Sequence, residues 1–177
     1  MAILSATTLL RAISLFHLTC AYYLLNSPTK LADHNLVFIL GASMDIPGPL
    51  DSSLSLPSPA LALAASFLAI LGVSDLAATG LPEEIASYYW SSQAPIRLVG
   101  FFGITGFSYL GKVEPKGVLP KGANRLGVSG LVCNSFTFTW GFVEMLGWFW
   151  IFVTLREERR EMMARKELRR KAEEERL

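Results

Sequence analysis

The sequence predicts an all-α membrane protein: a four-transmembrane-helix bundle with a charged cytosolic C-terminal helical extension. Three observations predict this class. Hydrophobic residues make up 51% of the 177 residues, and the mean hydropathy is +0.39. Charge is concentrated in residues 156–177, which hold nine of the 16 basic and seven of the 15 acidic residues, so the rest of the chain is far poorer in charge than a soluble domain. Four apolar stretches are long enough, or nearly so, to cross about 30 Å of hydrocarbon.

The predicted membrane domain, residues 1–155, contains these four spans: residues 5–25, 59–80, 95–111 and 131–155. The third is short and the fourth is long. A cleavable signal peptide is the alternative for the first stretch, but no basic region precedes it, and Arg11 and His17 interrupt its apolar part. Residues 156–177 contain no Gly or Pro and place Glu161 four residues before Arg165 and Glu167 four residues before Lys171, the favourable order for helical ion pairs. We expect them to continue the fourth helix as a solvated tail, with docking on a partner or on anionic lipid as the alternative.

The connections between the spans set the predicted orientation. With four spans both termini share one side, which carries Arg97 and the nine basic residues of the tail against five basic residues opposite. The positive-inside bias therefore predicts cytosolic termini. Residues 35–42 are apolar but too short to span, so we expect them at the membrane interface. Residues 81–94 are predicted to form a short interfacial helix that begins near Pro82, or else an ordinary loop.

Ionisable residues inside the spans are costly and need partners or a function. Counting from the cytosolic end of each span places Arg11 about 9 Å deep, Asp75 about 8 Å, His17 about 18 Å and Glu144 about 16 Å. Arg97 lies only two residues inside its predicted span and is expected to snorkel to the surface. The depths predict two pairs, Arg11 with Asp75 and His17 with Glu144.

The residues around Glu144 predict a close-packing helix face. Gly141 and Gly147 lie three residues before and after it, and Trp140 and Trp148 lie four residues before and after it. Glycine allows a neighbouring backbone to approach, and an indole N–H can donate to a carboxylate. We therefore expect Glu144 to face the bundle interior or a bound molecule. Two interpretations stay open: an interhelical clamp, or a site that handles a proton or a substrate.

Other features are consistent with packing rather than chemistry. Gly100, Gly103 and Gly106 predict a further close-packing face on the third span. Cys20 and Cys133 both lie near the non-cytosolic end, where they could form a disulfide or serve as small apolar residues. The sequence has no metal-ligand spacing, nucleophile signature or phosphate-binding loop, so we predict no catalytic residue, no cofactor and no metal. Nothing in it is typical of a nucleic-acid-binding surface.

Four strings, in order along the chain, carry a family resemblance: "MAILSATTLLRAISLFHLT", "LGVSDLAATGLPEE", "SSQAPIRL" and "FVEMLGWFWIFVTLREERRE". Together they resemble the fungal "increased loss of mitochondrial DNA" membrane-protein family. The resemblance implies a multi-span protein of the endoplasmic reticulum membrane, named for a mitochondrial-genome-loss phenotype rather than for an activity. It transfers no catalytic residue to this chain, and an indirect route through lipid supply would explain the phenotype.

We therefore predict a non-enzymatic membrane subunit or scaffold of an endoplasmic reticulum complex that handles lipids, in contact with membrane lipids and a larger membrane-protein partner. The alternative is a small transporter, channel or lipid-moving protein that uses Glu144 and His17. An intramembrane enzyme is disfavoured because Asp75 lies about a turn and a half from those two residues. A mitochondrial membrane is the alternative location.

Overall fold

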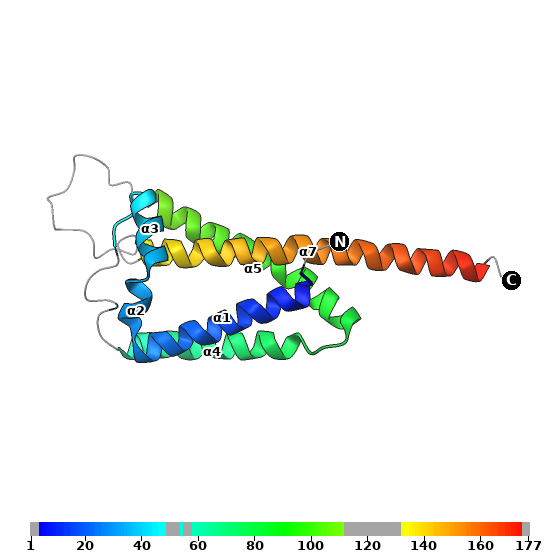
Figure 1. Cartoon of the computed structure of the whole chain (residues 1–177), viewed down its shortest axis with the longest axis horizontal. Coiled ribbons are helices and arrows are strands. Elements are labelled where there is room, and N and C mark those ends of the chain that lie inside the picture. The colour runs from blue at the N-terminus through cyan, green and yellow to red at the C-terminus, as the bar shows by residue number, and fades with distance from the viewer. Residues whose placement is uncertain (1–3, 49–53, 55–57, 112–131, 175–177) are drawn as a thin grey trace.

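The computed structural model describes residues 4–48, 54, 58–111 and 132–174, and all regular structure in these residues is helical. Its helices, shown in Figure 1, are α1 (Ala6–Asn26), α2 (Pro28–Ala32), α3 (Asn35–Ser43), α4 (Pro59–Ala78), α5 (Glu83–Leu110) and α7 (Ser135–Glu174). The predicted all-helical class is therefore confirmed for the described residues. The predicted loop at residues 112–130 lies outside them.

Three of these helices, α1, α4 and α7, are long and apolar enough to cross a membrane. Helix α5, which contains the predicted third span, does not reach that hydropathy in the described residues. Its 28 residues begin with Glu83 and Glu84 and include Arg97 in the middle. Length and composition thus indicate three candidate spans rather than the predicted four.

Helix α5 does not begin at Pro95, where the third predicted span begins. Helix α5 begins at Glu83 and runs through Pro95 without a break, so residues 83–94 are its first half rather than a separate interfacial helix or a loop. Proline lacks the N–H that its helix position would use, but membrane helices tolerate this loss because neighbouring groups satisfy the freed carbonyl. The early start moves Arg97 from a helix end to a helix interior.

The long helices form two antiparallel pairs, α1 with α4 and α5 with α7. A glycine lies at the helix contact within each pair. A Cβ atom at Gly72 of α4 would lie 3.0 Å from the carbonyl oxygen of Ser14 on α1. A Cβ atom at Gly141 of α7 would lie 2.7 Å from Oγ1 of Thr105 on α5. Small residues therefore let the backbones of both pairs approach closely, as the sequence predicts for Gly141.

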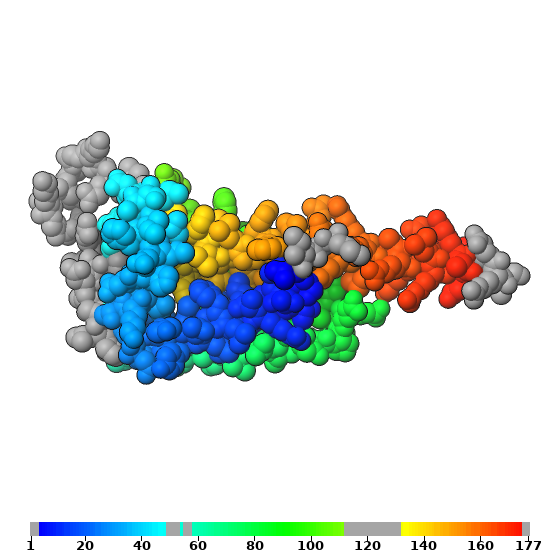
Figure 2. Space-filling model, in the orientation of Figure 1, coloured from blue at the N-terminus to red at the C-terminus, as the bar shows by residue number. Residues whose placement is uncertain are grey.

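The two pairs converge at one end of the molecule. There Ala6 and Leu10 of α1 join Trp90 of α5 and Trp148 and Ile151 of α7 in one buried apolar cluster. Toward the other end α1 and α7 diverge, and α2 and α3 run across the space between them (Figures 1 and 2). The two helix pairs are thus in contact through packed side chains at one end, and two short helices lie between them at the other end.

Helix α3 is fixed to the start of α7. A Cβ atom at Gly41 would lie 2.6 Å from Cβ of Ser135, and the backbone N–H of Ser135 donates to the carbonyl oxygen of Pro47 at 2.8 Å. Val37 is buried, whereas Phe38 and Ile39 are exposed. An apolar face exposed on a helix too short to span is typical of a segment that lies at the membrane interface.

Helix α7 continues past residue 155 to Glu174, so the charged segment extends the fourth predicted span without a break. The predicted pairs of Glu161 with Arg165 and of Glu167 with Lys171 are present at 3.4 Å and 3.7 Å. Nζ of Lys166 also donates to Oε1 of Glu84 at 2.9 Å and lowers the pKa of that carboxyl below its ordinary value. The extension therefore touches the first turn of α5.

The two cysteines do not form the disulfide that their predicted positions allowed. Cys20 and Cys133 are both free and buried. Sγ of Cys133 donates to the carbonyl oxygen of Phe107 at 3.6 Å. Both residues therefore serve as small, mainly apolar side chains, which is the other interpretation of the sequence.

Gly141→Ala should destabilise the α5–α7 pair, because the added methyl group would lie 2.7 Å from Thr105 Oγ1 and 3.4 Å from its backbone nitrogen. We expect the free energy of unfolding in detergent micelles to fall by about 1–3 kcal/mol, as in other overpacked sites. Gly100→Ala is the control, since nothing among the described residues lies within 4 Å of its added Cβ atom. Equal loss in both variants would refute the close approach.

Candidate functional site

Glu144 is the centre of the candidate site. Its side chain is fully buried on α7, and His17 of α1 is 1% exposed. Nε2 of His17 lies 2.6 Å from Oε1 of Glu144. The structure thus brings together the pair that depth counting predicts, and it joins the two helix pairs at this point.

The second carboxylate oxygen of Glu144 is held from its own helix. Nε1 of Trp148, one turn further along α7, donates to Oε2 at 3.0 Å. The other predicted indole, Trp140, instead stacks on Phe16 and His17 of α1, with ring centroids 5.6 Å and 6.4 Å apart. Each oxygen of Glu144 therefore has a hydrogen-bond partner, as a buried carboxyl requires.

The predicted close-packing face is used by two different neighbours. Gly141 faces Thr105 on α5, whereas a Cβ atom at Gly147 would lie 3.0 Å from Cδ1 of Ile13 on α1. Trp148 is fully buried. The face around Glu144 thus seats α7 between α1 and α5.

The predicted pairing of Arg11 with Asp75 is wrong. Asp75 of α4 is 1% exposed and accepts two hydrogen bonds from Arg97 of α5, at 2.5 Å and 2.8 Å. Nε of Arg11 donates instead to Oγ1 of Thr79 at 3.4 Å. The error follows from the misplaced start of α5: with the helix beginning at Glu83, Arg97 lies about 21 Å along it rather than at its end.

Arg97 connects this second pair to the first. Its guanidinium carbon lies 4.7 Å from the ring centroid of Trp148 and 5.7 Å from that of Trp90. A desolvated cation–π contact of this kind is worth about 2 kcal/mol. Asp75, Arg97, Trp148, Glu144 and His17 therefore form one continuous series of contacts, here called the polar chain. It passes through all four long helices in the order α4, α5, α7 and α1.

Sequence reasoning missed Arg97 and Trp90 as parts of this site. The available signal was the absence of any strong helix breaker between Glu83 and Pro95, which would have placed both residues on one continuous helix. Their spacing of seven residues puts them on the same helix face, where both reach the ring of Trp148.

The hydrogen bond between Glu144 and His17 joins α7 to α1 and is the contact through which a proton could pass between the two side chains. Three buried polar atoms have no hydrogen-bond partner in the part of the chain that the structure describes: His17 Nδ1, Trp90 Nε1 and Thr139 Oγ1. Within the same residues, no group of three or more His, Cys, Asp or Glu side chains could hold a metal ion. The polar chain thus contains one imidazole nitrogen, Nδ1 of His17, that has no hydrogen-bond partner among the described residues.

Fold and site together indicate a helical membrane protein whose long helices are joined by a buried polar chain. The chain belongs to the family described as "Increased loss of mitochondrial DNA protein 1" (Ilm1), whose model matches residues 4–165. It is 29% identical over 133 residues to "Protein ilm1" of Schizosaccharomyces pombe. The aligned residues make up 75% of this chain and 70% of that relative. No solved structure matches it. The resemblance seen in the sequence is therefore confirmed.

Replacing Arg97 should test the corrected pairing. Arg97→Met leaves the buried carboxylate of Asp75 without its two donors, and breaking one partner of a buried pair costs about 3–5 kcal/mol. Arg11→Met removes one long hydrogen bond from an exposed side chain and should cost less than about 1 kcal/mol. Unfolding by chemical denaturant in micelles measures both. A larger loss with Arg11→Met would restore the pairing predicted from depth.

Proposed function

We propose that this chain is a non-enzymatic subunit of a larger membrane complex in the endoplasmic reticulum, one that handles lipids and affects mitochondrial DNA indirectly. In this proposal α5 makes a fourth crossing beside α7, so both termini lie on one side, and the basic residues of the tail favour the cytosolic side. At 28 residues α5 is about 42 Å long, which exceeds the hydrocarbon thickness. The family description names a loss of mitochondrial DNA, and disturbed lipid supply is a route to that loss that requires no contact with DNA.

The observation that carries the proposal is an open glycine face on α5. Gly100, Gly103 and Gly106 follow one another at intervals of three, and no described residue lies within 4 Å of a Cβ atom built on any of them. Val99 and Phe102 beside them are exposed. Glycine on a membrane helix favours close approach of a second helix, and on α5 this face is not used by the described part of the chain itself.

The charged extension of α7 offers a second contact surface. Its side chains are largely exposed, and its apolar members Met163 and Leu168 are 59% and 68% exposed. Its two predicted i, i+4 ion pairs stabilise the helix by only a few tenths of a kcal/mol each. A long exposed helix anchored at Glu84 by Lys166 can present these residues to a partner in the cytosol.

Gly103→Leu should release the partner without unfolding the chain. No described residue lies within 4 Å of a Cβ atom at Gly103, and the leucine side chain would hold a second helix away from α5. Affinity purification of the full chain in mild detergent should recover a stoichiometric large membrane protein, and this protein should be lost in the variant while chain abundance stays normal.

The matched control is Ala64→Leu, which introduces the same side chain at an exposed position on α4. It should retain the partner. Recovery of the unaltered chain as a single monodisperse species without a partner would contradict the proposal, and so would loss of the partner from the control alone.

A second candidate function, a small transporter or lipid-moving protein, is favoured by one observation. Glu144 and Gly147 line a cavity of about 220 Å³ between α1 and α7, next to Ile13 and Phe16. A carboxyl beside a cavity at mid-membrane depth is a common feature of transport pathways. Against it, both oxygens of Glu144 already have partners within the protein.

Glu144→Gln separates the two candidates. The amide keeps the shape and can still accept a hydrogen bond, so a clamp should lose only about 1 kcal/mol, a typical value for one interhelical hydrogen bond in a membrane. We expect cells that carry this variant to keep their mitochondrial DNA and normal chain abundance. Loss of mitochondrial DNA at unchanged abundance would favour the pathway over the clamp.

A further inference from the structure

A cavity lies in the space where α1 and α7 diverge. Its volume is about 320 Å³, within the usual range of about 300–1,000 Å³ for ligand pockets. One face of each helix lines it: residues spaced i, i+3, i+4 and i+7 on α1 and the same spacing on α7. These wall residues are Phe16, Thr19, Cys20 and Tyr23 on α1, and Phe136, Thr139, Trp140 and Val143 on α7.

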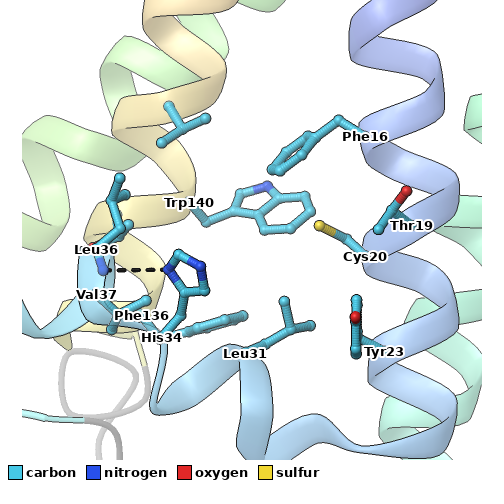
Figure 3. Close-up of a pocket in the computed structure, with 12 residues that line it drawn as sticks. Phe16, Thr19, Cys20, Tyr23, Leu31, His34, Leu36, Val37, Phe136 and Trp140 are labelled. Carbon is cyan, nitrogen blue, oxygen red and sulfur yellow. Dashed lines mark hydrogen bonds between the residues drawn. The ribbon is translucent and has the colours of Figure 1, made fainter.

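The cavity has a floor and a rim. Phe16 and Trp140 stack across it, with ring centroids 5.6 Å apart, and close one side of it (Figure 3). Trp140 also stacks on His17, so this is the side of the polar chain. The rim is formed by Tyr23 at the end of α1 and by His34 at the start of α3. From Phe16 to Tyr23 the wall of α1 is about 10 Å long.

The cavity is short enough to fit within one leaflet of a bilayer. The rim lies at the level of α3, whose exposed Phe38 and Ile39 are typical of the membrane interface, and the floor lies at the level of Glu144 at mid-depth. Half of the hydrocarbon thickness is about 15 Å. A groove that runs from the interface toward the midplane has the position and direction of an acyl chain.

One polar group, His34, lies at the rim, where the glycerol and ester groups of such a lipid would be, and a second, Thr139, lies deeper, next to Trp140. Nδ1 of His34 accepts a hydrogen bond from the backbone N–H of Leu36 at 3.2 Å, so the neutral ring carries its proton on Nε2. Figure 3 shows Nε2 on the side of the ring that faces the cavity. On the α7 wall, Thr139 is 5% exposed, and its hydroxyl has no described hydrogen-bond partner. Nε2 of His34 can therefore donate to an oxygen of the ligand at the rim.

We propose that the cavity between α1 and α7 binds one acyl chain of a membrane phospholipid, with His34 donating to the glycerol-ester or phosphate oxygens at the rim. A transmembrane helix of a partner, about 10–12 Å across with its side chains, does not fit this volume. Water is disfavoured because the walls are almost entirely apolar. The lipid surrounds the protein at high concentration and needs only to enter between α1 and α7.

Photolabelling tests the site directly. The full chain is reconstituted in phosphatidylcholine vesicles that contain a phosphatidylcholine with a diazirine on one acyl chain, and labelled peptides are mapped by mass spectrometry. The result expected is severalfold enrichment of label on residues 16–23 and 136–143 over Phe67, which is exposed on α4 and samples the surrounding lipid. Equal labelling of Phe67 and the cavity would overturn the site.

Two matched variants give the control. Thr19→Trp places a large side chain in the cavity from the α1 wall and should lower the enrichment of label severalfold. Leu15→Trp changes an exposed residue of the same helix outside the cavity and should leave the enrichment unchanged. Thr19→Phe replaces the larger variant if its melting temperature falls. Unchanged enrichment in a folded Thr19 variant would overturn the proposal.

A photoreactive sterol tests the identity of the lipid. If the sterol labels the cavity and phosphatidylcholine does not compete with it, the phospholipid assignment is wrong. The inference rests on the membrane setting of the proposed function but not on the partner. Labelling uses the chain without a partner, so its failure leaves the affinity purification unaffected, and failure to recover a partner leaves the labelling result valid.

Discussion

The hydrogen bond between Glu144 and His17 is the contact on which the arrangement of the long helices depends. A fully buried carboxyl in an apolar helix has to find partners inside the protein, because neither water nor lipid supplies them. Trp148 provides one partner from the same helix, but the second comes from α1. The need to satisfy this one side chain therefore brings together two helix pairs that otherwise pack mainly within themselves.

The same constraint explains why the α1–α7 cavity exists. Helices α1 and α7 are held at the apolar cluster around Trp148 and again at Glu144, and beyond that point they diverge. Asp75 and Arg97 brace the opposite side by joining α4 to α5. Because α1 and α7 diverge beyond the polar chain, a space remains between them there, and α2 and α3 cover its end (Figure 2).

The sequence predicted those parts of the structure that depend on position along a helix. His17 and Glu144 are level in depth, and counting residues was sufficient to pair them. Asp75 could not be paired in this way. Its partner depends on whether its side chain faces Arg11 on α1 or Arg97 on α5, and depth carries no information about direction around a helix axis. The misread Pro95 added to this error, since a proline inside a membrane helix looks like a helix start. The cavity was also unpredictable, because it arises from divergence of two helices distant in sequence.

The central claim is that the polar chain holds the two helix pairs in one arrangement. The most direct measurement is the distance distribution between spin labels at Val73 on α4 and Phe149 on α7, both exposed, in the full chain in vesicles. We expect one narrow distance in the unaltered protein and a broad distribution in Trp148→Leu, which removes both the donor to Glu144 and the ring beneath Arg97. The same narrow distance in a folded Trp148→Leu variant would contradict the account.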